Sequence, residues 1–234
     1  MFKSSHVLCK VDDLHQAVND FEEMGFFVQW GGPPEKAANA LIWFETGPFI
    51  ELIDTNKAQP PAFMSWILRL FSPKGMMKRF DQWQNQKEGW CEIALETHDL
   101  DVKPFVRDLR HQGLKISGPF ENKRTPPNET QITTQTAFPH NVQLPILMGA
   151  YRPQPRPTSI SHPNGSVSIE KIVIGVHQDD QAQWEHLLDK NDAWTCLNNG
   201  AFGIQSVSLN GLRGPLNSSL THGVVIFPAD VTAS

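Results

Sequence analysis

Alternating apolar and polar positions at the start of the chain predict a compact unit of four strands and one helix. Residues 5–11 alternate as in a strand, and Asp12-Asp13 then provides an N-cap for a helix. Apolar side chains follow at helical spacing up to Gly25, a residue type that commonly ends a helix. Three further strands, bounded by Gly and Pro turns, are expected at 26–30, 40–45 and 49–53. The first 55 residues therefore have the order βαβββ.

The same pattern returns in the middle of the chain. Residues 90–97 predict a strand, His98-Asp99 a cap, and a stripe of apolar positions predicts a helix that ends at Gly113. Later strands of this copy are expected at 114–116, 131–136 and 145–150. A second copy of the unit is thus expected between residues 89 and 152.

A third and weaker copy is expected near the C-terminus. Residues 169–176 predict a strand, Asp179-Asp180 a cap, and the apolar positions that follow predict a helix. Two later strands are expected, at 203–209 and 223–227.

The repeat predicts an α+β fold of tandem βαβββ modules. One four-stranded sheet with a single helix leaves a face and two edges uncovered, whereas two such units side by side can form an open curved sheet, or cup, with a pocket. The expected boundaries are a paired-module domain at 1–152 (modules 1–55 and 89–152, insertion 56–88), a Pro-rich linker at 153–165 and a third, incomplete module at 166–234.

The insertion at 56–88 departs from the modular pattern and is expected to be mainly helical. Met64, Ile67, Leu68 and Phe71 are spaced as one apolar face, and Met77, Phe80 and Trp83 predict further helical turns. We favour a helical cover over one end of the cup, because an apolar helical stripe most often belongs to a core. The alternative is a lid or a homodimer contact.

Composition narrows the class of partner. The chain has 234 residues, a net charge of −5 and no cluster of Lys and Arg, so nothing favours binding to nucleic acid or to an anionic membrane. Its apolar runs are far shorter than the roughly twenty residues of a membrane span. The start of the chain lacks the apolar segment of a signal peptide. Three scattered cysteines without CxxC spacing indicate reduced thiols and a cytoplasmic location.

Several short motifs resemble those of bacterial glyoxalase-like domain proteins in the vicinal-oxygen-chelate superfamily. They are Gly31-Gly32, Ala38–Leu41, Pro48–Ile53, Arg124–Asn128, Leu144–Leu147 and His162–Gly165. The chain departs from the pattern at Pro33-Pro34 and Ala37-Ala38, where the group usually has a His and a Gly-Thr. The resemblance implies a pocket for a small-molecule ligand in the cup.

The resemblance also implies a candidate metal site. Metal-using members of the superfamily take ligands from the first and fourth strands of paired modules, and these positions hold His6 and Glu51 here. A metal there would act as a Lewis acid on a bound oxygen pair, with a carboxylate such as Glu51 moving a proton.

The second module offers a less complete set of ligands. Aligning the Asp-Leu caps of the two modules places Glu92 opposite His6. Aligning the prolines that open the fourth strands places Met148 opposite Glu51, and methionine is a poor ligand for a hard or borderline divalent metal. His6, Glu51 and Glu92 could still hold a divalent ion with open positions. The alternative is that His6 and Glu51 form a buried hydrogen-bonded pair in a cup without metal.

Two further residues are candidates for the ligand pocket. Arg124, beside Lys123 in a Pro-rich loop, could clamp a carboxylate or phosphate, or could be a solvated cation. Asn39 begins an inward-facing strand, where it could contact a ligand or fix a turn.

Two functions follow from these residues. The first is a metal-dependent lyase, isomerase or dioxygenase-type enzyme that acts on a small oxygenated molecule. The second is a metal-free protein that binds or sequesters an apolar or aromatic small molecule, with some of the seven Trp and fourteen Phe lining the pocket.

Overall fold

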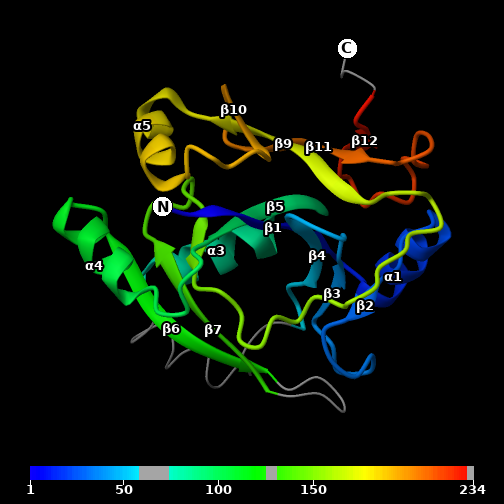
Figure 1. Ribbon diagram of the computed structural model, residues 1–234, viewed down its shortest axis with the longest axis horizontal. Helices are drawn as coiled ribbons and strands as arrows, with labels where there is room; N and C mark the ends of the chain where they lie inside the picture. Colours follow the sequence, from blue (N-terminus) through cyan, green and yellow to red (C-terminus); the bar gives the residue numbers. More distant parts are fainter. Residues whose placement is uncertain (58–73, 125–130, 231–234) are drawn as a thin grey trace.

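A computed structural model of the chain describes residues 1–57, 74–124 and 131–230 (Figure 1). The first half contains β1 (Lys3–Val11), α1 (Leu14–Glu23), β2 (Gln29–Trp30), β3 (Asn39–Ile42) and β4 (Phe49–Asp54). After α3 (Lys74–Asn85), the second half contains β5 (Gly89–Glu96), α4 (Lys103–His111), β6 (Ile116–Arg124), β7 (Ile132–Pro139) and β8 (Ile146–Met148). The third unit contains β9 (Ser168–Val176), α5 (Gln178–Leu187), β10 (Thr195–Asn199), β11 (Gly203–Asn210) and β12 (Ile226–Pro228).

The first two repeats share one open, eight-stranded sheet in the order β2-β3-β4-β1-β5-β8-β7-β6. β1 lies antiparallel to β5, and the first strand of each half pairs in parallel with its last strand, β1 with β4 and β5 with β8. The prediction of an α+β fold in which the first two modules form one sheet is therefore confirmed.

An approximate two-fold axis relates the two halves and passes between β1 and β5. Three consecutive cross-strand pairs define it: His6–Ala94, Val7–Ile93 and Leu8–Glu92. Exchanging the halves maps His6 onto Glu92 and Leu8 onto Ala94. The structure thus supports the sequence alignment that made Glu92 the equivalent of His6 in the second module.

The third unit has the predicted strand, helix and two later strands, together with β10, which was not predicted, and its strand order differs from that of the first two units. In its four-stranded sheet, β10-β9-β11-β12, the first strand β9 pairs in parallel with β10, the strand that directly follows the helix. In the other two units the first strand pairs in parallel with the last one. This unit therefore cannot extend the large sheet by the same pairing.

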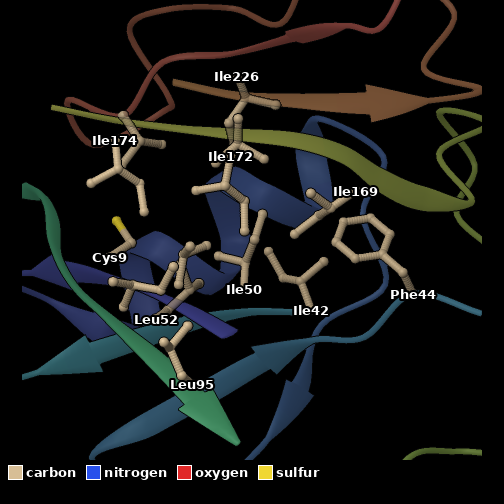
Figure 2. Packing of buried hydrophobic residues seen from close by; sticks show 14 of the residues in the cluster. Cys9, Ile42, Phe44, Ile50, Leu52, Leu95, Ile169, Ile172, Ile174 and Ile226 are labelled. Atoms are coloured by element: carbon tan, nitrogen blue, oxygen red, sulfur yellow. The ribbon is translucent and has the colours of Figure 1, made fainter. Parts of the chain in front are cut away.

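The third unit instead covers one face of the eight-stranded sheet. Figure 2 shows Ile169, Ile172 and Ile174 of β9 facing Ile50 and Leu52 of β4 across the interface between the two sheets. All five side chains are buried. Removing an isoleucine or leucine side chain from water contributes about 1.5–3 kcal/mol, so this interface is a principal source of stability.

The sequence misplaced the start of two helices. The predicted cap His98-Asp99 lies before α4, whose N-cap is Val102 and has no side-chain cap hydrogen bond; the Lys103 amide donates to Asp101 Oδ1 at 3.1 Å. At α5 the Asp179 amide donates to His177 Nδ1 at 3.4 Å, so His177 is the cap and Asp179-Asp180 form the first turn. Carboxylates in that turn still interact favourably with the helix dipole.

The Pro-rich linker crosses the outside of the first half and is fastened there by His162. The Phe27 amide donates to His162 Nδ1 at 2.9 Å, and Nε2 lies 2.9 Å from the Trp43 carbonyl oxygen. Because Nδ1 accepts a hydrogen bond, the ring is neutral and Nε2 is the donor. Burial lowers the pKa of His162, consistent with this neutral ring.

His222 ties the third unit to both halves of the large sheet. Its Nε2 lies 3.0 Å from Asp20 Oδ2 on α1, and its Nδ1 lies 3.1 Å from Glu88 Oε1 just before β5.

None of the helices in the described ranges is long and apolar enough to cross a membrane.

Ile172→Ala is expected to lower the free energy of unfolding by about 2–5 kcal/mol, because it leaves a cavity between the two sheets. Urea unfolding followed by circular dichroism measures this change. Val225→Ala is the matched control, because Val225 is 53% exposed. Equal unfolding midpoints for the two variants would contradict the packing described here.

His162 should make stability depend on pH. Its folded-state pKa is depressed, so the unfolded chain binds its proton more readily, and stability falls as pH drops below about 6.5. His162→Gln, which keeps a donor for the Trp43 carbonyl, should flatten this part of the profile. Urea unfolding of both proteins between about pH 7 and about pH 5 tests this. Parallel profiles would show that His162 is not the group responsible.

Candidate functional site

A cavity of about 420 Å³ lies on the face of the eight-stranded sheet that the third unit leaves uncovered. The alternation of side chains along β4 builds it, because Ile50 and Leu52 enter the core while Glu51 and Ile53 line the cavity. Both halves contribute to its walls. From the first half come His6, Asn39, Leu41, Glu51 and Ile53.

One corner of the cavity is polar and brings together three residues named from the sequence. His6 Nε2 lies 3.3 Å from Glu51 Oε2, and Asn39 Nδ2 donates to Glu51 Oε1 at 2.8 Å. His6 also stacks on Phe49, with ring centroids 4.6 Å apart. The side chains of His6 and Glu51 are 7% and 15% exposed, so the carboxylate is the more accessible of the two.

Gly31 makes room for this corner. A Cβ atom at residue 31 would lie only 1.9 Å from Asn39 Oδ1, so any other residue type would displace the Asn39 side chain. The Gly31 amide also donates to the Asn39 carbonyl oxygen at 2.9 Å. Gly31, the first residue of the Gly-Gly motif, is therefore the sequence signal for the position of Asn39 beside Glu51.

Glu92 does not join His6 and Glu51 in lining the cavity. Its carboxylate forms an ion pair with the Arg79 guanidinium of α3, and the two side chains are 2% and 1% exposed. Burial raises the pKa of Glu92, and the charge of Arg79 opposes part of that rise. The expected convergence of three ligands is thus not found, because α3 covers Glu92 and supplies its counter-charge.

The position equivalent to Glu51 in the second half is apolar, although the sequence alignment named the wrong residue. Glu51 pairs with Leu8, and the counterpart of Leu8, Ala94, pairs with Ile146. The equivalent residue is therefore Ile146, two positions before Met148 on the same face. Both Ile146 and Met148 line the cavity.

The residues of the cavity do not fit a resident divalent metal ion. A stable protein site usually supplies at least three ligands, whereas His6 and Glu51 are the only pair from the predicted set that meets in the cavity. Within residues 1–57, 74–124 and 131–230, no group of three or more His, Cys, Asp or Glu side chains could hold a metal ion.

The rest of the cavity wall is largely apolar and was not recognised from the sequence. Helix α3 contributes Met76, Phe80 and Trp83, spaced i, i+4 and i+7 along one face. The predicted apolar stripe of the insertion included two of these three, as a cover rather than as a pocket wall. Of its other five residues, Met77 is not among those that line the cavity, and Met64, Ile67, Leu68 and Phe71 lie outside the described residues. The second half adds Ala94, Phe120, Phe138, Ile146, Met148 and Tyr151.

The rim of the cavity carries a few polar side chains from β6 and β7. Asn122, Thr134 and Thr136 line it, as does Lys123, whose Nζ lies 2.5 Å from Glu121 Oε1. Arg124 is the last residue of β6, and its predicted role as a ligand clamp stays a prediction.

Paired βαβββ halves around a pocket define the vicinal-oxygen-chelate fold. Residues 5–190 match the sequence model of a family described as glyoxalase-like domain, so the chain belongs to that family. The resemblance identified from the short motifs is thereby confirmed.

Solved structures with a similar fold include a hypothetical protein from Staphylococcus aureus. It is 16% identical, with a TM-score of 0.69 over 97% of this chain and 98% of that one. Another is the Mn(II)-bound glyoxalase from Novosphingobium aromaticivorans, which is 12% identical with a TM-score of 0.53 over 90% of this chain and 65% of that one. At these identities the likeness shows the fold alone. No curated protein sequence matches the chain.

Arg79→Met is expected to lower the free energy of unfolding by about 3–5 kcal/mol near pH 7, because Glu92 would remain buried without a counter-charge. The folded state would then bind a proton on Glu92 more tightly than the unfolded state does. The stability of this variant should therefore rise as pH is lowered from about 8 to about 5.

Urea unfolding at several pH values measures both effects. Adding Glu92→Gln should restore part of the loss and remove its pH dependence. Arg107→Met, at a side chain that is 68% exposed, is the control and should leave stability nearly unchanged. A loss for Arg79→Met that does not change with pH would show that Glu92 is not the group left unpaired.

Proposed function

We propose that this protein binds and sequesters an apolar, aromatic small molecule that presents a cationic or hydrogen-bond-donating group to Glu51, without a resident metal ion. The observation that supports this most directly is the asymmetry of the cavity. Among the described residues that line it, Glu51 is the one carboxylate, and the apolar Ile146 stands at the equivalent position of the second half, where a further metal ligand would be needed.

The shape and lining of the cavity suit such a ligand. Its volume of about 420 Å³ lies within the range of small-molecule sites, which are mostly apolar with a few placed polar groups. Phe80, Trp83, Phe120 and Phe138 offer ring surfaces for stacking with an aromatic body.

The carboxylate of Glu51 favours a ligand that presents a hydrogen-bond donor, rather than an acceptor, to the polar corner of the cavity. Glu51 accepts a hydrogen bond from Asn39 through Oε1, and its Oε2 lies 3.3 Å from His6 Nε2. Within the described residues it forms no ion pair with Lys or Arg, so a ligand cation would add a new charge-assisted hydrogen bond. Lys123, the cation at the rim, already pairs with Glu121. An anionic ligand would therefore find its best partner at the entrance rather than at Glu51.

A second candidate is an enzyme acting on a small oxygenated substrate, which the His6–Glu51 contact favours. A buried imidazole 3.3 Å from a carboxylate can accept or relay a proton when a substrate lies beside it. We infer a cytoplasmic location for either function, which the free thiols of Cys9, Cys91 and Cys196 support.

Dye binding and metal content separate the two functions. Protein purified without chelator should contain far less than one metal ion per chain, and should bind a cationic acridine dye more tightly than an anionic naphthalene sulfonate dye. Glu51→Gln should weaken binding of the cationic dye about tenfold, because it removes one charge-assisted hydrogen bond.

Glu22→Gln is the matched control, because Glu22 is exposed on α1. It should leave dye affinity unchanged. One tightly held metal ion per chain that disappears in His6→Ala would instead support the enzyme and sink the metal-free proposal.

A further inference from the structure

We infer that Arg79 replaces a divalent metal ion as the counter-charge of Glu92 and thereby keeps metal ions out of the cavity. This inference rests on the metal-free binding proposed above. Arg79 would be the residue that makes the site metal-free, and His6, Glu51 and Glu92 would form a metal site in its absence.

Strand positions alone would let Glu92 reach the polar corner. Leu8 on β1 pairs with Glu51 on β4 and with Glu92 on β5, so the two carboxylates stand on either side of Leu8. His6, two residues before Leu8 on the same face, is a diagonal neighbour of both. Diagonal neighbours across antiparallel strands are about 7–8 Å apart, within reach of long side chains.

In the structure, only one of the two carboxylates beside His6 is in contact with it. His6 is in contact with Glu51 at 3.3 Å, whereas Glu92 points its charge to Arg79. Under the approximate two-fold axis, Glu92 takes the position of His6 and Ile146 takes the position of Glu51, so Glu92 has no polar partner at the equivalent strand position. Its partner comes instead from α3, whose Arg79 supplies the counter-charge.

The Arg79 guanidinium is held by the loop between β7 and β8 as well as by Glu92. Its Nη2 donates to the carbonyl oxygens of Leu144 at 2.6 Å, Asn141 at 3.2 Å and Pro139 at 3.3 Å. A metal ion that recruited Glu92 would have to break the ion pair and approach this fixed positive charge. Both costs act against metal binding in the native protein.

Removing the charge of Arg79 should reverse this selectivity. A buried carboxylate without a partner favours any cation that can enter, and Glu92 would then lie near His6 and Glu51 on one face. One imidazole and two carboxylates form a donor set that suits Mn²⁺. The variant should therefore acquire a metal site that the native chain does not offer.

The test uses Arg79→Gln, which keeps amide donors for the loop carbonyls, and Arg79→Met as a second variant. Thermal unfolding with and without Mn²⁺, together with calorimetric titration, gives stability and stoichiometry. At a hundredfold excess over Kd, Mn²⁺ should raise Tm by roughly 5–10 °C in at least one variant, with one ion bound per chain. The wild-type Tm should not change.

The controls assign the site to particular residues. Adding Glu92→Gln or His6→Ala to the responding variant should abolish its Mn²⁺ response. Arg110→Gln is the matched control, because Arg110 donates to the Ile116 carbonyl oxygen at 2.9 Å and forms no ion pair with a carboxylate in the described structure. It should not respond to Mn²⁺.

The possible failures are distinguishable. A lack of any Mn²⁺-dependent gain in stability or structure in both Arg79 variants would overturn the inference and leave metal-free binding intact. A response that survives Glu92→Gln would also overturn it. A wild-type protein that itself binds one Mn²⁺ tightly through His6 would overturn the proposed function, whatever the variants do.

Discussion

The antiparallel pairing of β1 with β5 is the constraint on which the rest of the molecule depends. It joins the two halves into one sheet and fixes which residues meet across the approximate axis. A shift of this pairing by one residue would turn His6 into the core and Val7 into the cavity. The buried apolar face of β1 opposes such a shift, because Val7 and Cys9 pack in the core that the third unit covers. One interface therefore fixes both the hydrophobic core and the position of the polar corner.

Much of the fold could be predicted from the sequence because it follows from local periodicity. The alternation in residues 5–11 and the Asp13 cap, whose Oδ1 accepts from the His15 amide at 2.9 Å, specify β1 and α1 without distant contacts. The edge strand β6 was underestimated, because its polar run Glu121–Lys123 lacks apolar alternation. The strand order of the third unit was also unpredictable, since order depends on which edges meet and not on the elements themselves.

The candidate site was predictable only where its residues lie on the central strands. The predicted meeting of His6 and Glu51 follows from strand parity and pairing, and the two side chains lie 3.3 Å apart. Asn39 was named only as a separate candidate for the pocket. Glu92 has the right parity too, yet its partner comes from α3, outside the repeat. A single arginine among the apolar positions of that helix was the available signal. The partner of this arginine depends on how the insertion packs against the sheet, and hydrophobic periodicity does not determine that packing.

The difference between Glu51 and its equivalent residue Ile146 makes the two ends of the cavity chemically different. Two related halves with the same polar groups would accept an elongated molecule equally well in either orientation, and would present the same groups to both of its ends. Here one end meets the carboxylate of Glu51, while the related position at the other end holds the hydrocarbon of Ile146. A guest with unlike ends should therefore bind in a single orientation, with its hydrogen-bond-donating end at Glu51 and its hydrocarbon end at Ile146.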